Sequence, residues 1–271
     1  MNIMKHLVSR LSVAFVCAAL LIPCTSPAAK PAPVLLAVFA HPDDESTVSA
    51  VLAKYAAAGV NVYLATATDG RLGVAPHAGT TAGDSLAATR AQELKCTTEK
   101  LGINPPIMFG LYDQLKMGEG LQPHMAQLAE MRDRVTKLFE ELQPDAVITW
   151  GPSGWTGHPD HRLVSDIVTE VFQSRTWSKP AQLYYPAVPT GKVPANNPIP
   201  LATVDERFLT TKIRVSQADY EKSKAGWLCH RTQYTPEQIE QLYQSLVAAQ
   251  GGIAHFQPLL AGKGGKKDSL L

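Results

Sequence analysis

The stretch VLLAVFAHPDDE, residues 34–45, decides the fold of this chain. Its first half, residues 34–39, is an unbroken apolar run, which is typical of a β-strand buried on both faces. Strands of this kind belong to parallel sheets that are covered by helices on both sides. Its second half, residues 40–45, places imidazole, proline and carboxylate groups where that strand ends. Because open α/β sheets bind ligands at the carboxyl ends of their strands, residues 40–45 are the first candidate for a functional loop.

The rest of the chain continues this alternation of buried strands and helices. Further strands are predicted at residues 60–66, 107–111 and 146–150, and helices at residues 47–58, 86–101, 125–142 and 162–172. The last third is less regular, with strands predicted at 183–188 and 208–215, a proline-rich loop at 186–200, and helices at 216–232 and 236–249. This order predicts a Rossmann-like, doubly wound α/β domain, with a mostly parallel sheet and helices on both of its faces.

The composition is that of one globular domain. The chain has 271 residues, of which 45% are hydrophobic, and this is enough for a single large core. We assign residues 30–262 to that domain and expect residues 263–271, which are rich in glycine and lysine, to form a disordered tail. The 25 Lys and Arg residues nearly balance the 24 Asp and Glu residues, and they do not cluster. We therefore expect no binding to nucleic acid, which needs a basic patch.

Residues 1–29 have the layout of a secretory signal peptide. Lys5 and Arg10 come before an apolar run at residues 11–22, and small residues follow at 25–29. We therefore expect an exported protein, periplasmic or extracellular, with no stable membrane insertion after the leader is cleaved. The alternatives are an uncleaved N-terminal anchor and lipid attachment at Cys24.

Two cysteines, Cys96 and Cys229, lie beyond this leader. They either form one disulfide after export or remain as two buried thiols, because pairing in space does not follow from sequence. The sequence contains no Cys-x-x-Cys pattern, which argues against a structural zinc ribbon.

A second polar cluster, GHPDH at residues 157–161, follows the strand predicted at 146–150. A tight turn after the first strand would let His41 and Asp44 converge, and His161 would reach the same point from the second cluster. Two imidazoles and one carboxylate bind a divalent metal and leave positions open for water and substrate. For each cluster alone, the alternative is a capped helix start, since Asp accepts backbone N–H bonds and proline fits a first turn. The presence of both clusters favours the metal site.

These two segments resemble the paired signature motifs of the PIG-L/LmbE-like family, which are AHPDDE at 40–45 and HPDH at 158–161 here. Members of that family are zinc-dependent de-N-acetylases of N-acetylglucosamine conjugates. Weaker likenesses extend the resemblance over residues 34–233: TDG at 68–70, Arg90 with Glu93, and HRTQ at 230–233. The resemblance implies a hydrolase that removes an acetyl group from the nitrogen of an N-acetylglucosamine-type sugar through a metal-activated water.

The resemblance also implies a role for each motif residue. The metal ligands would be His41, Asp44 and His161, with Zn²⁺ as the favoured ion and other divalent metals as alternatives. Asp43 would be the general base that accepts a proton from the water. Protonated His158 would stabilise the oxyanion. Asp160 would either orient an imidazole or cap the following helix.

Four further residues are candidates for substrate binding: Arg71, Arg90, Trp155 and His230. Trp155 could stack on a sugar face, because it directly precedes the second motif. Some relatives carry a tyrosine where this chain has Thr156, which puts assistance by a tyrosine in doubt. Arg71 could equally be a solvated loop arginine, and His230 could equally be a hydrogen-bonded structural histidine.

Other functions fit the same residues. One is a metal-dependent amidase or esterase, including a phosphoesterase, although phosphoesterases usually need two metals and more carboxylates. Another is a non-catalytic sugar-binding protein, against which the presence of Asp43 argues. The expected partner is a small-molecule or glycan substrate bearing an N-acetyl amino sugar, within a larger exported or cell-surface glycan. We expect a pocket built around the small acetyl group, which would reject longer acyl chains.

Overall fold

The computed structural model describes residues 31–193, 195–197, 199–260 and 267–271. Residues 1–29, for which the sequence predicts a signal peptide, lie outside this set. Among the residues that are described, no helix combines the length and the apolar character needed to cross a membrane.

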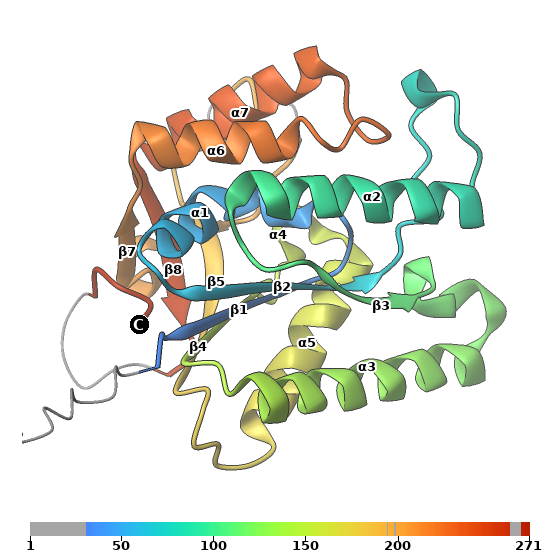
Figure 1. Cartoon of the computed structure of the whole chain (residues 1–271), viewed down its shortest axis with the longest axis horizontal. Helices are drawn as coiled ribbons and strands as arrows, with labels where there is room; N and C mark the ends of the chain where they lie inside the picture. Colours follow the sequence, from blue (N-terminus) through green and yellow to red (C-terminus); the bar gives the residue numbers. More distant parts are fainter. Residues whose placement is uncertain (1–30, 194, 198, 261–266) are drawn as a thin grey trace, which may run out of the picture. The chain divides into compact units, whose positions relative to one another are not determined.

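The sheet confirms the predicted doubly wound architecture (Figure 1). Five strands pair in parallel in the order β3-β2-β1-β4-β5: Ile107–Leu111, Asn61–Thr68, Val34–Phe39, Ala146–Thr149 and Gln182–Pro189. Strand β8 (Ile253–Pro258) is antiparallel to β5 on one side and to β7 (Thr211–Arg214) on the other. The two-residue β6 (Thr203–Val204) pairs with the end of β5. The sheet is therefore mixed but mostly parallel.

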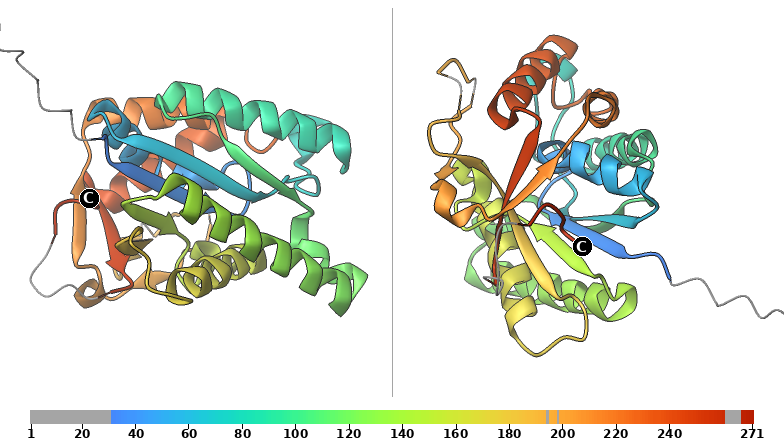
Figure 2. Two further views of the ribbon diagram at one scale, coloured as in Figure 1. Left: turned by 60° about the horizontal axis from the view of Figure 1, so that its bottom comes forward. Right: turned by 90° about the vertical axis from the view of Figure 1, so that its left-hand side faces the viewer.

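Helices cover both faces of the sheet, as Figure 2 shows. One face carries α1 (Ser49–Ala57), α2 (Asp84–Leu101), α6 (Gln217–Trp227) and α7 (Pro236–Gln250). The other carries α3 (Leu121–Leu142) and α5 (Pro159–Gln173). Short helical turns lie in the connections: η1 (Asp44–Thr47), η2 (Pro76–Ala78), η3 (Asp113–Glu119), α4 (Gly154–Gly157) and η4 (Glu206–Phe208).

Strand β1 holds the two helix layers together, because its side chains alternate between two hydrophobic cores. Leu35, Ala37 and Phe39 belong to the core under α1 and α6. Leu36 and Val38 belong to the core under α3 and α5. A strand with this period-two alternation and apolar residues on both faces must be central, which is the position that the opening run predicts.

The C-terminal region differs from the prediction in two respects. Strand β8 is not predicted from the sequence, although it fills the space between β5 and β7. The expected disordered tail at residues 263–271 is wrong for residues 267–271: Lys267 bridges to Thr211, and Leu270 is only 3% exposed. The backbone N–H of Leu270 also donates to the hydroxyl of Tyr55 at 2.7 Å. Burial of this apolar side chain holds the end of the chain against the domain.

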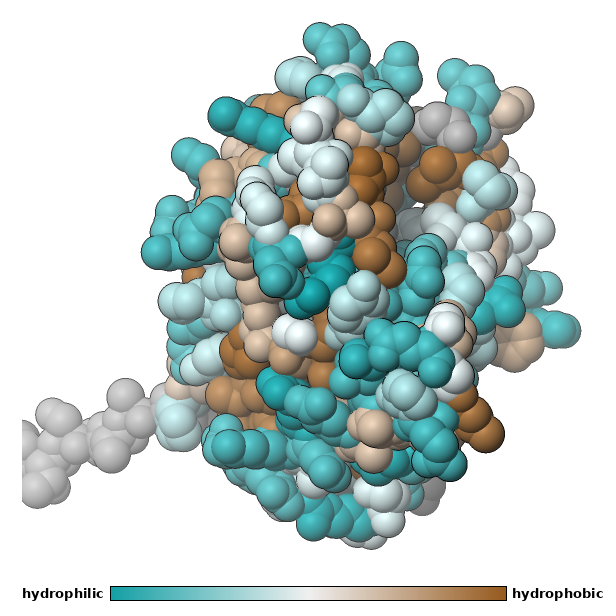
Figure 3. Space-filling view, turned by 90° about the vertical axis from the view of Figure 1, so that its right-hand side faces the viewer, coloured by the Kyte–Doolittle hydropathy of each residue, from teal (hydrophilic) through white to brown (hydrophobic). Residues whose placement is uncertain are grey.

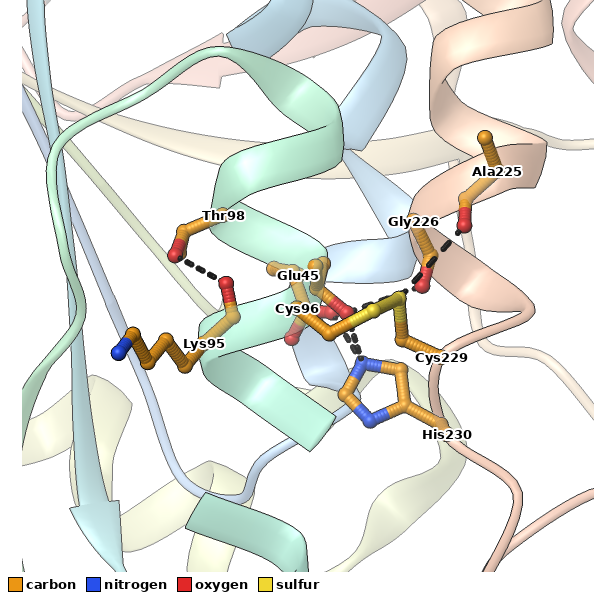
Figure 4. The surroundings of a disulfide bond; sticks show 9 residues. Glu45, Lys95, Cys96, Thr98, Ala225, Gly226, Cys229 and His230 are labelled. Carbon is orange, nitrogen blue, oxygen red and sulfur yellow. Dashed lines mark hydrogen bonds and ion pairs between the residues drawn. A yellow bond between two sulfur atoms is a disulfide. The ribbon is translucent and has the colours of Figure 1, made fainter. Parts of the chain in front are cut away.

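Cys96 and Cys229 form a disulfide. Cys96 lies on α2, and Cys229 lies two residues after the end of α6 (Figure 4). The sequence leaves open a disulfide or two buried thiols, and the structure contains the disulfide. It joins α2 to the turn that follows α6, next to the buried pair of Glu45 and His230.

Candidate metal and catalytic site

The topology brings the two polar clusters to one place. Strands β1 and β4 are parallel neighbours, with Val38 opposite Thr149, so their carboxyl ends lie side by side. The chain continues from β1 to β2 on one side and from β4 to β5 on the other, so this is the point where the strand order reverses. Doubly wound sheets bind their ligands at such points. Figure 3 views this edge of the molecule, where hydrophilic and hydrophobic side chains border a hollow.

The carboxylate of Asp44 is fixed by the backbone of its own loop. Its Oδ2 accepts the backbone N–H groups of Ala40 and His41, both at 2.9 Å, and the indole N–H of Trp150 at 3.2 Å. Burial would raise the pKa of Asp44, but the imidazoles of His161 and His41 hold it well below its usual range. Asp44 is therefore a buried, ionised carboxylate in a fixed position.

Two imidazoles face this carboxylate. Nδ1 of His161 lies 2.9 Å from the carbonyl oxygen of Gly154, while its Nε2 lies 3.1 Å from Oδ1 of Asp44. Nε2 of His41 lies 3.1 Å from Oδ2 of Asp160, while its Nδ1 lies 3.6 Å from Oδ2 of Asp44. When the outer nitrogen of each ring donates to its acceptor, the inner nitrogen is left as a ligand that points toward Asp44.

This donor set fits a divalent metal. Among the described residues, His41, His158 and His161 present ligand atoms within 4.8 Å of one another, and so do His41, Asp113 and Asp160. Imidazole nitrogens with a carboxylate oxygen suit zinc and several other divalent ions. Burial alone would lower the pKa of His41, yet Asp44 and Asp160 raise it to about 10, so the site favours positive charge. The set of His41, Asp44 and His161 stays a prediction.

Asp43, the predicted base, lies beside this set in an unusual backbone conformation with φ 126°. Its backbone N–H donates to Oε2 of Glu45 at 3.1 Å, and its Oδ1 lies 3.3 Å from the guanidinium of Arg90. Its Oδ2 accepts the hydroxyl of Tyr234 at 3.2 Å. Burial raises the pKa of Asp43, and Arg90 opposes the shift. A strained, held carboxylate of this kind is suited to proton transfer.

Asp160 orients His41 and does not cap the helix with its carboxylate. Its Oδ2 accepts the backbone N–H of Gln114 at 2.9 Å and also faces His41. The capping position of α5 belongs to His158, whose Nδ1 accepts the N–H of Asp160 at 3.2 Å. Burial and the neighbouring His41 lower the pKa of His158, which does not favour the protonated form that the resemblance implies.

Two of the substrate-binding candidates are arginines with other partners. Arg71 pairs with Asp69 at 2.5 Å and with Asp84 at 2.9 Å, and it lines neither of the hollows described below. Arg90 is buried and donates to the carbonyl oxygens of Pro42 and Gly70, so it fixes the loops on either side of Asp43. It also faces Oδ1 of Asp43 at 3.3 Å and lines the polar hollow described below, so its role as a substrate-binding residue stays a prediction.

The other two candidates are placed very differently. Trp155 lines an apolar hollow beside Asp43, where a substrate group can reach it. His230 is fully buried, with Nε2 2.6 Å from Glu45 and 3.0 Å from Thr97. The expectation that His230 contacts substrate is therefore corrected to its alternative, a hydrogen-bonded structural histidine.

Sequence reasoning missed two residues of this site, Tyr234 and Asp113. Tyr234 directly follows the HRTQ segment, and its hydroxyl is bonded to Asp43. Asp113 lies two residues after β3 and accepts the backbone N–H groups of Gly70 and Leu72 at 3.0 and 2.8 Å. The signal for Asp113 was its place at the end of a strand, on the same edge of the sheet as His41.

Two hollows meet at the candidate catalytic residues. One has a volume of about 320 Å³, and its lining is rich in polar side chains: His41, Arg90, Asp113, Gln114, His158 and Gln233. The other has a volume of about 160 Å³, and its lining is mainly apolar. The residues that line both are Asp43, Asp44, Thr156, His161 and Tyr234. The predicted base and two predicted ligands thus stand at the junction.

Residues 36–172, half of the chain, match the family described as GlcNAc-PI de-N-acetylase, or PIG-L. The chain belongs to the PIG-L family. A curated relative is the 1D-myo-inositol 2-acetamido-2-deoxy-alpha-D-glucopyranoside deacetylase of Mycobacteroides abscessus, which is 30% identical over 229 residues, 74% of this chain and 81% of the relative. The chain spans about half the length of other curated relatives that it matches, such as 47% of one from Catenulispora acidiphila.

Solved structures confirm the fold of this PIG-L protein. The N,N'-diacetylchitobiose deacetylase of Pyrococcus horikoshii superposes with a TM-score of 0.62 at 19% identity, covering 84% of both chains. The 4-carboxy-2-hydroxymuconate hydratase of Pseudomonas putida superposes with a TM-score of 0.62 at 14% identity, covering 86% of this chain and 98% of the hydratase. By their names these two proteins catalyse different reactions, so the fold alone does not choose the chemistry.

Proposed function

We propose that this PIG-L protein is a metal-dependent hydrolase that cleaves the amide on the nitrogen of an N-acetylglucosamine-type amino sugar. The observation that carries the proposal is the convergence of His41, Asp44 and His161 with Asp43 beside them. A site for simple sugar binding needs no carboxylate held at a strained position next to a metal-binding set. The names of the relatives, which are deacetylases of sugars, support the same reaction.

The residues of the chain divide the chemistry between them. His41, Asp44 and His161 would hold the metal, with zinc as the favoured ion. A bound divalent ion would lower the pKa of water and polarise the amide carbonyl. Asp43 accepts a proton from the attacking water and returns it to the departing amine.

Two neighbours assist these steps. The hydroxyl of Tyr234 donates to Oδ2 of Asp43 while the guanidinium of Arg90 lies 3.3 Å from Oδ1, so the two together hold the carboxylate in position for the water. His158 lines the polar hollow, where its imidazole can donate a hydrogen bond to the oxyanion that forms from the carbonyl.

We also propose that the enzyme is exported. The basic, apolar and small-residue order of residues 1–29 supports export. The Cys96–Cys229 disulfide supports it independently, because disulfides persist in oxidising compartments outside the cytosol. N-terminal sequencing of protein from the periplasm or medium should find a start near Ala28 or Ala29; an intact Met1 in the membrane fraction would favour an anchor.

The test of the reaction is acetate release from a panel of compounds, with and without a chelator. The panel contains N-acetylglucosamine, its short oligomers, an N-acetyl amino acid and an acetyl ester. The proposal expects chelator-sensitive release from the sugars. Faster turnover of the amino acid or the ester would leave a metal hydrolase but remove the sugar assignment, and no release from any amide would reject the proposal.

A further inference from the structure

The apolar hollow beside Asp43 is larger than the removal of an acetyl group requires. Its apolar walls come from five parts of the chain: Trp150 and Trp155 after β4, Val188 of β5, Ile199 and Leu201 of the following loop, Trp227 of α6, and Leu242, Leu246 and Ala249 of α7. An apolar cavity of about 150 Å³ binds benzene. The hollow, at about 160 Å³, therefore has room for about six carbon atoms, whereas acetyl brings one methyl group. The hollow is therefore larger than the pocket fitted to an acetyl group that we expect from the sequence.

The position of the hollow indicates which part of a substrate enters it. The amide must lie at the junction of the two hollows, because Asp43 and His161 line both. On one side of that junction, Gln114, Gln233 and His158 offer hydrogen-bond partners for sugar hydroxyls. Beyond the junction, the apolar side offers only Ser46, Thr47, Asn197 and Ser245 against nine apolar residues, so a sugar ring there would leave most of its hydroxyls unpaired. The sugar therefore takes the polar side, and the group on the other end of the amide, the acyl chain, points into the apolar hollow.

We propose that this hollow binds a medium-length acyl chain, and that the preferred substrate is an amino sugar N-acylated with about six carbons. This inference rests on the proposed function, since it assumes the same amide hydrolysis. Water adds to the carbonyl carbon, the carbon–nitrogen bond breaks, and the products are a fatty acid and a free amino sugar. The water supplies the acid's hydroxyl oxygen and the proton that the nitrogen gains.

The substrate series that tests the proposal varies only the acyl chain on methyl glucosaminide, from two to ten carbons. Each methylene buried in the hollow should raise kcat/KM about fourfold, which corresponds to about 0.8 kcal/mol. The four methylenes between acetyl and hexanoyl are therefore expected to raise kcat/KM about 250-fold, followed by a fall once the chain outgrows the hollow. If acetyl is cleaved best, the inference fails while the proposed function stands. If no member of the series is cleaved, the proposed function itself fails.

A second series separates the acyl chain from an apolar group on the other side of the sugar. It keeps the acetyl group and lengthens the alkyl chain of the glycoside from methyl to hexyl. The proposal expects little change in kcat/KM along this series. A rise that matches or exceeds that of the acyl series would show that the hollow holds the aglycone, and would overturn the assignment.

A pair of variants on α7 ties the preference to the hollow. Ser245 is half-buried and lines the hollow, so Ser245→Phe should fill it, whereas Ala248 is exposed on the same helix and Ala248→Phe is the matched control. Ser245→Phe should lower kcat/KM for the hexanoyl substrate at least tenfold more than for the acetyl substrate, which occupies little of the hollow. The control should change neither. Equal loss for both substrates, or an equal effect in the control, would contradict the proposal.

Binding gives a readout that does not depend on turnover. Because three tryptophans line the hollow, N-hexanoylglucosamine should change the tryptophan fluorescence of Asp43→Asn, and N-acetylglucosamine should bind more weakly. Adding Ser245→Phe to that variant should remove the difference between the two ligands. If both ligands bind Asp43→Asn equally, the hollow does not contact the acyl chain.

Discussion

At the residue scale, each imidazole of the predicted metal site has one ring nitrogen held by a hydrogen-bond partner and a second nitrogen available as a ligand. His161 is held by Gly154 on one nitrogen, and His41 by Asp160. The free nitrogens then face Asp44, which the backbone of its own loop keeps in place. A site built in this way is pre-organised, so the removal of one member should have a specific effect on metal or on turnover.

His161→Ala should lose most of its bound metal while remaining folded. The substitution removes one of the three predicted ligands, and the remaining pair cannot hold a divalent ion as well. Metal content per chain, measured on purified protein by elemental analysis, checks this prediction, with circular dichroism as the control for folding. Full metal retention would remove His161 from the ligand set.

Asp43→Asn should keep the metal and lose turnover by about 10²–10⁴-fold. The amide is nearly the same size as the carboxylate and can still accept the hydroxyl of Tyr234, but it cannot take a proton from water. Kinetics on the substrate that the panel identifies, together with metal analysis, test this role. Near-normal kcat in a metal-loaded variant would mean that another group is the base.

At the scale of elements, the sequence predicts the helices and strands whose ends are set by neighbouring residues in the chain. The bounds of β1 and β3 agree with the prediction, because each is a short apolar run between polar or turn residues. Helix α7 is predicted to within one residue at its end, since Thr235 caps it and Pro236 starts it. Strand β8 is not predicted although residues 254–257 alternate between apolar and polar, because four residues are the shortest run in which alternation indicates a strand. Its pairing with β5 and β7 extends it to six residues.

The site likewise divides into residues that a local motif places and contacts that depend on the packing of distant elements. The paired motifs were sufficient to place His41, Asp43 and Asp44 together, because all three lie in one turn after one strand. They could not show that Arg90 of α2 pairs with Asp43, or that Tyr234 reaches Asp43 across 191 positions of sequence. Those contacts depend on how distant elements pack, and no local pattern encodes them.

The His230–Glu45 pair, which joins the end of α6 to η1, should make stability depend on pH. Burial lowers the pKa of His230, but the charge of Glu45 and its hydrogen bond raise it above the usual value, with a smaller contribution from Asp43 and opposition from Arg90. A raised pKa in the folded state means that the pair stabilises the fold fully below the unfolded pKa of about 6.5. That contribution is lost as pH rises through the folded pKa.

His230→Gln should remove this part of the pH dependence, since glutamine still donates to Glu45 but does not titrate. Urea unfolding at several values between pH 6 and 9 gives the free energy of unfolding for both proteins. The wild type should be more stable than the variant at pH 6, and the difference should shrink as the pH rises. Parallel curves for the two proteins would show that His230 does not change its protonation between the folded and unfolded states in this range.

At the scale of the whole molecule, the fold and the site have a common origin in the reversal of strand order between β1 and β4. The half built on β1, β2 and β3 supplies the first loop with Asp43, the predicted base, and β4 supplies the second loop with its histidines. The C-terminal helices α6 and α7 close one side of the site and form much of the apolar hollow. The site therefore forms only when the C-terminal third of the chain packs correctly against the N-terminal half. The disulfide links these two parts.

The Cys96–Cys229 bond closes a loop of 133 residues, and its removal should lower stability more than activity. In the chain-entropy account, a loop of this length restricts the unfolded chain by about 5 kcal/mol. For a domain of this size, the double variant Cys96→Ser/Cys229→Ser should therefore melt about 10–20 °C lower than the wild type. The bond lies outside the lining of both hollows, so kcat at low temperature should be nearly unchanged.

Reduction provides the matched control, because a reductant should lower the Tm of the wild type to that of the double variant and leave the double variant unaffected. Thiol titration of the unfolded, unreduced protein without its leader should find no free cysteine, whereas the reduced protein should show two. Two free thiols without reduction, or a Tm that reductant does not change, would mean that the two sulfurs are not joined in the protein as produced. In that case the disulfide would no longer support export, and the proposal of export would rest on the order of residues 1–29 alone.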